Sequence, residues 1–178
     1  MKIILVMVSS ADGKTTTWAK SASHGWSSKE DGEHFRLLKS KHRLIVMGRK
    51  TYEQIKNELV LTPHTRRIVI TRKPTDFLHE AVAGQLEFSD EPPLTLVRRL
   101  ESLGFDTMLL VGGSELNGEF LKAKLINECY ITIEPRFFGS GKSLFAGTHV
   151  DIRLKLLEVH TLNGQGTLML HYSLQYDH

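Results

Sequence analysis

The chain of 178 residues contains a single cysteine, Cys129, so it cannot form an internal disulfide. A protein without disulfides is typical of a reducing compartment. No apolar run approaches the roughly 20 residues that a membrane-spanning helix needs. The opening run at residues 3–8 is short, and no small-residue cleavage site follows it. We therefore expect a cytoplasmic protein with no membrane partner.

Several chemical signatures are also missing. The nine histidines are dispersed and no His-Glu-x-x-His occurs, so we expect no metal site. The chain has no Gly-x-Ser-x-Gly elbow, no Gly-x-Gly-x-x-Gly after its first apolar run, and no P-loop. Its formal charge is only +3, and the Lys and Arg residues are scattered rather than clustered. This pattern does not indicate nucleic-acid binding.

What remains is an ordinary globular composition, 40% hydrophobic and 24% charged, in a length that suits one domain over residues 1–178. Periodicity predicts helices at about 28–40, 51–56, 93–104 and 114–121, and strands at about 2–8, 44–47, 67–70, 86–88, 108–111, 129–133, 153–162 and 167–175. The first helix should begin at Ser28 and bury Phe35 and Leu38. Strands that alternate with helices and end in a hairpin predict an α/β fold. Its mixed, mostly parallel sheet should carry helices on both faces and a C-terminal antiparallel hairpin.

The segment Met108-Leu-Leu-Val-Gly-Gly-Ser-Glu-Leu-Asn-Gly-Glu-Phe-Leu121 passes from strand to helix at Gly112 and Gly113. Paired glycines let the backbone approach a ligand closely, and the first turn of the helix offers unpaired N–H groups to a phosphate. An ordinary strand-to-helix turn is the alternative interpretation, because glycine is the usual turn residue.

Two other predicted strands end in residues that suit phosphate, and in a parallel sheet such ends meet at one edge. One end reads Gly48-Arg-Lys-Thr51 and the other Thr71-Arg-Lys73. A dinucleotide such as NADP could use several of these groups, with its 2′-phosphate held by Arg49 and Arg72. Simple solvation of these cations is the alternative.

Candidates for acid–base work are Asp12, Glu30 and Asp31. The structural alternatives are a turn at Asp12-Gly13 and stabilisation of a helix N-terminus by Glu30 and Asp31. Residues 10–28 form a long polar segment that carries two tryptophans, and such a segment is typical of a lid or binding loop.

Two motifs, Met47-Gly-Arg-Lys-Thr-Tyr-Glu53 and Val111-Gly-Gly113, resemble the cofactor-binding segments of dihydrofolate reductases. Ser10-Ala-Asp-Gly-Lys14, Gly25-Trp-Ser-Ser28, the segment at 110–121 and the loop at 135–145 resemble the RibD C-terminal domain, the reductase domain of riboflavin biosynthesis. The resemblance implies a dihydrofolate reductase-like three-layer fold, NADPH as cofactor and a homodimer.

The resemblance also implies roles for individual residues. Gly48, Arg49, Lys50 and Thr51 would contact the adenylate and pyrophosphate side of NADPH, and Thr71 and Arg72 its 2′-phosphate. The pyrophosphate would lie against Gly112, Gly113, Ser114, Glu115 and Leu116. The lid and substrate side would include Ser10, Asp12, Trp26, Ser28 and Val111. At the position of Val111, just before the paired glycines, riboflavin reductases usually carry Glu.

For the substrate, the resemblance implies 5-amino-6-(5-phosphoribosylamino)uracil or a similar pyrimidine. Dihydrofolate or another pterin is the enzymatic alternative, in which Asp31 would supply the carboxylate that dihydrofolate reductases place in their first helix. A protein that binds NADP without turnover is the alternative from another class.

Overall fold

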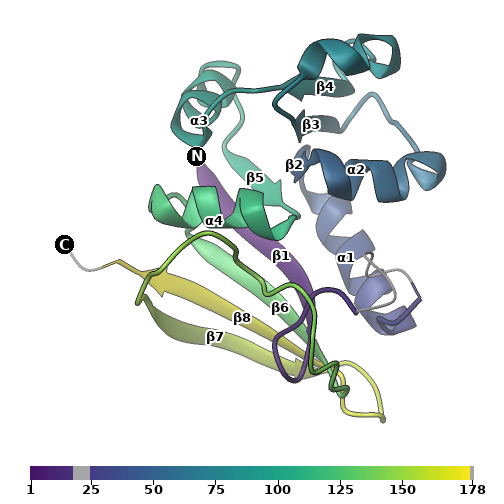
Figure 1. Ribbon diagram of the computed structural model, residues 1–178, viewed down its shortest axis with the longest axis vertical. Helices are drawn as coiled ribbons and strands as arrows, with labels where there is room; N and C mark the ends of the chain where they lie inside the picture. The colour runs from purple at the N-terminus through teal and green to yellow at the C-terminus, as the bar shows by residue number, and fades with distance from the viewer. Residues whose placement is uncertain (18–24, 177–178) are drawn as a thin grey trace.

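The computed structural model describes residues 1–17 and 25–176, and within them one eight-stranded sheet runs through the molecule (Figure 1). Its strands are β1 (Lys2–Ser10), β2 (Leu44–Gly48), β3 (Arg66–Ile70), β4 (Leu86–Ser89), β5 (Thr107–Leu110), β6 (Glu128–Glu134), β7 (Arg153–Thr161) and β8 (Leu168–Gln175). The helices are α1 (Lys29–Lys41), α2 (Arg49–Ile55), α3 (Pro93–Ser102) and α4 (Ser114–Lys122), with 3₁₀ segments η1 (Lys56–Glu58) and η2 (Pro74–Glu80).

The strand order is β4-β3-β2-β5-β1-β6-β8-β7. The first six strands in this order are parallel, β8 pairs antiparallel with β6, and β7 pairs antiparallel with β8. The predicted mostly parallel sheet with a C-terminal hairpin is confirmed. Because β1, β2, β3 and β5 are parallel neighbours, the segments that follow them all emerge at one edge of the sheet.

Helices cover both faces of the sheet. On one face, α3 and α4 bury Leu96, Leu100 and Phe120 against β1, β2, β3 and β5. On the other face, Leu38 of α1 and Tyr52 of α2 pack against the alternate residues of the same strands. The central strands are therefore apolar on both sides, as expected for buried parallel strands.

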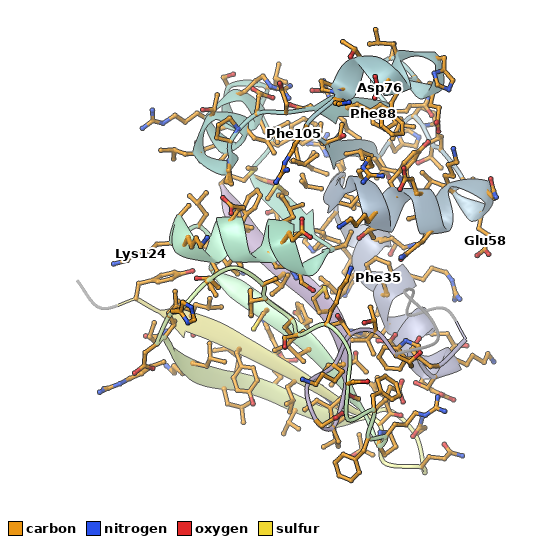
Figure 2. All side chains as sticks on the ribbon, viewed as in Figure 1. Phe35, Glu58, Asp76, Phe88, Phe105 and Lys124 are labelled. Atoms are coloured by element: carbon orange, nitrogen blue, oxygen red, sulfur yellow. The ribbon has the colours of Figure 1, made fainter. Side chains whose placement is uncertain are left out.

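The start of α1 follows the sequence prediction. The Ser28 hydroxyl accepts the backbone N–H of Asp31 at 3.2 Å, and Leu38 is buried. The prediction that Phe35 belongs to the core is wrong. Phe35 remains partly exposed and lines a cleft, near the middle of the view in Figure 2. Helical periodicity identifies an inward-facing side but does not say whether the core or a cavity lies there.

Residues 75–92 have little sequence pattern, and tertiary packing orders them. The ring of Phe77 in η2 stacks on Phe88 of β4 at 5.0 Å, and the Tyr52 hydroxyl donates to Glu80 at 2.6 Å. Figure 2 shows Phe88 and Asp76 together at the β4 end of the sheet. None of the helices in the described residues is long and apolar enough to cross a membrane.

Candidate functional site

A cleft of about 2400 Å³ opens at the edge of the sheet where β1, β2, β3 and β5 end. Its floor includes Val6, Met7 and Met47, and α1 forms one wall. The predicted site residues that line it are Ser28, Asp31, Gly48, Arg49, Lys50, Thr51, Thr71, Arg72, Val111, Gly112, Gly113, Ser114, Glu115 and Leu116. The cleft therefore brings together residues that were predicted from four separate segments of the chain.

Two glycine turns meet at the centre of the cleft. The backbone N–H of Gly48 donates to the Gly112 carbonyl at 2.7 Å, and Gly112 has φ +92°, which favours glycine. The Gly112–Gly113 peptide bond is cis. A Cβ on Gly48 would lie 3.4 Å from the Gly113 nitrogen, and one on Gly113 would lie 3.6 Å from the Thr51 hydroxyl. Small residues at all three positions let the two backbones lie side by side.

Charged side chains surround the turn at the start of α4. Lys50 Nζ lies 3.2 Å from a Glu115 carboxylate oxygen, so the pair links α2 to α4. Lys50 lowers the pKa of Glu115 most, and the positive charges of Lys142 and Arg72 act in the same direction. Three cations are therefore close to one carboxylate, and their charge suits an anionic ligand.

The two predicted 2′-phosphate residues differ in their surroundings. Arg72 is exposed, whereas the neighbouring Thr71 is buried and its hydroxyl accepts the Lys73 N–H. Arg49 is engaged within its own helix, where its guanidinium donates to both oxygens of Glu53 at 2.7 Å. A phosphate would meet Arg72 directly but would compete with Glu53 for Arg49.

The glycine-rich loop at 135–147 is held against α4. Ser114 donates its hydroxyl to the Ser143 carbonyl at 2.6 Å, and Asn117 donates to the Leu144 carbonyl at 2.9 Å. A return bond runs from Ala146 N–H to the Ser114 carbonyl. These contacts fix the loop beside the glycine turn and place Lys142 in the lining of the cleft. The sequence prediction missed Lys142, since one Lys in a loop carries no signal of its own.

Asp31 lies in the wall of the cleft formed by α1. Burial raises the pKa of its carboxyl, and the nearby negative charge of Glu134 acts in the same direction. Hydrogen bonds with the side chains of Thr132 and Ser27 oppose that rise. A carboxyl whose pKa is raised in a cleft is suited to general acid catalysis.

Beyond Asp31 the cleft extends between α1 and the segment after α2. This arm contains Phe35, Lys39 and Arg67, together with the apolar side chains of Ile55, Leu59 and Val60. Arg67 is only 8% exposed, and its guanidinium donates to the carbonyls of Val60 and Thr65. Burial lowers the pKa of both Arg67 and Lys39. Sequence reasoning missed this arm because Arg67 belongs to a predicted strand, and the strand pattern does not show that its side chain lines a cleft.

Three predicted residues do not line the cleft. Ser10 and Asp12 hydrogen-bond to each other, and the Asp12 carboxylate accepts the N–H groups of Phe138 and Gly139. Trp26 is buried edge-on against the Phe138 ring at 4.9 Å. Asp12 and Trp26 therefore contact the loop after β6, and Ser10 holds Asp12 in place. Residues 18–24 of the predicted lid lie outside the described residues.

Comparisons with known proteins agree with this architecture. The uncharacterized protein YwjB of Bacillus subtilis is 30% identical over 114 residues, which is 63% of this chain and 63% of YwjB. The matched part therefore spans less than two thirds of that relative. A pyrimidine reductase-like protein from Corynebacterium diphtheriae has the same fold, with a TM-score of 0.79 at 14% identity over 99% of this chain and 92% of its own.

A second solved structure is the diaminohydroxyphosphoribosylaminopyrimidine deaminase/5-amino-6-(5-phosphoribosylamino)uracil reductase of Thermotoga maritima. It matches 98% of this chain and 56% of its own length, with a TM-score of 0.77 at 18% identity. At such low identities the two structures establish the fold alone. The model of the RibD C-terminal domain matches residues 1–168, so the chain belongs to the RibD C-terminal domain family.

Proposed function

We propose that this chain is an NADPH-dependent reductase whose substrate is 5-amino-6-(5-phosphoribosylamino)uracil or a closely similar pyrimidine. The observation that carries the proposal is the meeting of the Gly48 and Gly112–Gly113 turns in the cleft. Membership in the RibD C-terminal domain family supports the reaction class. Two glycine turns in contact leave backbone close to any ligand that lies over them.

The residues around these turns fit a dinucleotide. Gly112, Gly113 and the first turn of α4 would hold the pyrophosphate, with Lys50 and Lys142 supplying positive charge. Thr51 would contact the same side, and Arg72 would bind the 2′-phosphate. When bound, NADPH supplies the hydride, and the chain's task is to align donor and acceptor and to exclude water.

We assign Asp31 as the proton donor. Reduction of a C=N bond by hydride requires a proton on the nitrogen, and a carboxyl that remains protonated can donate it. Asp31 lines the cleft and its pKa is raised by burial. Ser28 and Val111, which also line the cleft, would lie near the substrate.

The test is oxidation of NADPH by the purified protein, followed by absorbance. Three compounds are offered separately: 5-amino-6-(5-phosphoribosylamino)uracil, the corresponding pyrimidine before deamination, and dihydrofolate. We expect turnover with the uracil compound, and little turnover when NADH replaces NADPH. Turnover with dihydrofolate alone would replace the proposed substrate. NADPH binding without turnover on any of the three would reduce the proposal to a nucleotide-binding protein.

Dihydrofolate is retained as the second candidate because of the arm between α1 and η1. Dihydrofolate carries a benzoyl ring and a glutamate tail, whereas the pyrimidine carries a phosphoribosyl group. The arm offers Phe35 and Leu59 to a ring, and Arg67 and Lys39 to an anion at its far end. Arg67→Met would separate the candidates. It should raise KM strongly for dihydrofolate but much less for dihydropterin, which has no carboxylate tail.

We also infer that the protein is a homodimer that associates through β7. Every residue of β7 is exposed, and Leu154, Leu156 and Val159 are 46%, 50% and 53% exposed. They pair with Leu174, Tyr172 and Leu170, which alternate along β8, so a bulge at Leu157 places all three on one face. An apolar stripe on an edge strand suits a second copy of the same strand.

A further inference from the structure

Glu134 is the last residue of β6 and is only 4% exposed. Charged groups are seldom buried so deeply unless they are paired or fully hydrogen-bonded. None of the ion pairs found in the described residues includes Glu134. Its role therefore has to be sought in its hydrogen bonds and in what lies beside it.

Both oxygens of Glu134 accept hydrogen bonds. Oε1 accepts the backbone N–H of Ser28 at 2.6 Å, and Oε2 faces the hydroxyl of Thr167 at 2.8 Å. A backbone N–H can only donate, so the first bond has a fixed direction. The direction of the second depends on where the Thr167 hydrogen points.

The β7–β8 turn fixes that hydrogen. Asn163 Oδ1 accepts the backbone N–H groups of Gln165 and Thr167, so its Nδ2 must be the donor on the other side. Asn163 Nδ2 donates to Thr167 Oγ1 at 3.0 Å and to Glu30 at 3.1 Å. The Thr167 oxygen already receives a hydrogen, so its own O–H points to Glu134. Glu134 therefore accepts hydrogen bonds at both oxygens, as an unprotonated carboxylate does.

Asp31 shares this environment. The Ser28 N–H binds Glu134, while the Ser28 hydroxyl caps the N–H of Asp31. Asp31 hydrogen-bonds to Thr132, which lies two residues before Glu134 on β6 and so points to the same face of the sheet. The partly buried carboxyl of Asp31 is therefore close enough to the buried carboxyl of Glu134 to be affected by its charge, and two such groups do not both ionise readily.

We propose that Glu134 is a positioning residue for the proton on Asp31: the anchored Glu134 anion makes Asp31 the member of the pair that retains the proton. The proposal rests on the proposed function, in which Asp31 is the proton donor. The turn at Asn163 takes part indirectly, because it orients Thr167. In this way the C-terminal hairpin sets the protonation state of a residue on the first helix.

The other charged groups near Asp31 do not duplicate this role. Lys29 and Glu30 belong to the same helical turn, and Glu30 is directed to Asn163. Arg136, in the loop after β6, donates to the Trp26 carbonyl. Ser27 and Thr132 contribute only hydroxyl groups. Glu134 is therefore the buried charge whose removal should most affect Asp31.

The experiment follows the carboxyl carbon of Asp31 by NMR across a pH titration, without substrate, in the wild-type protein and in Glu134→Gln. Glutamine keeps an oxygen that can accept the Ser28 N–H, so a purely structural role for Glu134 predicts an unchanged midpoint. We expect the Asp31 midpoint to move to lower pH. The matched control is Glu30→Gln, which removes a partly exposed carboxylate from the same network and should leave the midpoint in place.

An unchanged Asp31 midpoint in Glu134→Gln, or an equal shift in Glu30→Gln, would overturn the proposal. If Glu134→Gln does not fold, Thr167→Val serves instead. It removes one hydrogen-bond donor to Glu134 and so weakens the arrangement that leaves the proton on Asp31; the Asp31 midpoint should again fall. An unchanged Asp31 midpoint in Thr167→Val would overturn the proposal.

The pH profile of turnover provides a second measurement. A proton donor loses activity as pH rises through its pKa, so the alkaline fall in activity should begin at lower pH in Glu134→Gln. If no substrate supports turnover, the proposed function fails, while the NMR titration still decides whether Glu134 controls Asp31.

Discussion

Asp31 must carry a proton when the substrate binds if it is to serve as the donor. We expect Asp31→Asn to lower kcat by roughly 10²–10⁴-fold, the usual contribution of a positioned acid or base. NADPH affinity should stay the same, because Asp31 is assigned to the substrate side of the cleft. Steady-state kinetics and fluorescence titration with NADPH measure the two quantities. Unchanged turnover would return Asp31 to a purely structural role in α1.

The same residue gives a pH dependence of stability. Burial raises the pKa of Asp31 in the folded protein, so the folded state binds its proton more tightly than the unfolded chain. The resulting stabilisation is complete below the ordinary pKa of Asp and is lost as pH rises through the raised pKa. We therefore expect the difference in unfolding free energy between wild type and Asp31→Asn to change across that window, as measured by urea unfolding at several pH values.

Arg72 gives a test of cofactor choice. It is exposed at the mouth of the cleft, where a 2′-phosphate would form charge-assisted hydrogen bonds with it. We expect Arg72→Ala to weaken NADPH binding about 10-fold or more, since such bonds contribute roughly 1.5–3 kcal/mol. NADH binding should hardly change. Equal losses for the two nucleotides in calorimetry would contradict the 2′-phosphate assignment.

Individual site residues were predictable where strand ends and turn chemistry define them. Gly48 and Gly112 follow from the glycines at two strand ends, and Asp31 follows from the resemblance to dihydrofolate reductases; all three line the cleft. Trp26 was predicted on the substrate side but does not line the cleft. The sequence does not decide this position, because an aromatic side chain in a polar segment can face a ligand or a neighbouring loop. Only tertiary structure reveals that Phe138 covers it.

At the scale of elements, the contact between α4 and the loop at 142–147 can be tested by substituting Gly118, with a substitution of Gly32 as the control. A Cβ on Gly118 of α4 would lie 2.2 Å from the Ala146 carbonyl oxygen. We expect Gly118→Ala to lower the unfolding free energy by roughly 1–3 kcal/mol, as overpacking does. It should also weaken NADPH binding, because the displaced loop carries Lys142.

The matched control is Gly32→Ala in α1, where no atom lies within 4 Å of the added Cβ. There the substitution should stabilise the protein by about 0.5–1 kcal/mol, because alanine favours a helix more than glycine does. Thermal unfolding of both variants compares the effects. A stable Gly118→Ala protein with normal NADPH affinity would show that the loop is not held by this contact.

Elements were predictable where the apolar pattern is strong. The bounds of β2, β5 and α4 are within one residue of expectation, because β2 and β5 are short, continuous apolar runs and the apolar residues of α4 recur with the helical period. The segment η2 lacks such a period. It is ordered by Phe77 and Glu80, which contact Phe88 of β4 and Tyr52 of α2. Such contacts between distant segments cannot be predicted from the local sequence.

At the scale of the whole molecule, the apolar stripe of β7 predicts the oligomeric state. We expect Leu156→Lys to shift the protein from dimer to monomer, because a charge in the middle of an apolar interface opposes association. Light scattering after size-exclusion chromatography measures the mass. The control is Leu37→Lys, a similarly exposed leucine that belongs to α1 and not to the β7 stripe. A dimer that survives Leu156→Lys would place the interface elsewhere.

The central position of β1 in the sheet has a consequence for biosynthesis. β1 is made first, yet its partners come late: Lys2 pairs with Thr107 of β5, and Ile4 with Glu128 of β6. At roughly 5–20 residues per second, the ribosome takes on the order of ten seconds to make the first of those partners. During that time the continuous apolar run at residues 3–8 has no neighbouring strand. Chaperone capture and aggregation should therefore compete with folding mainly during synthesis, before the sheet can close around β1.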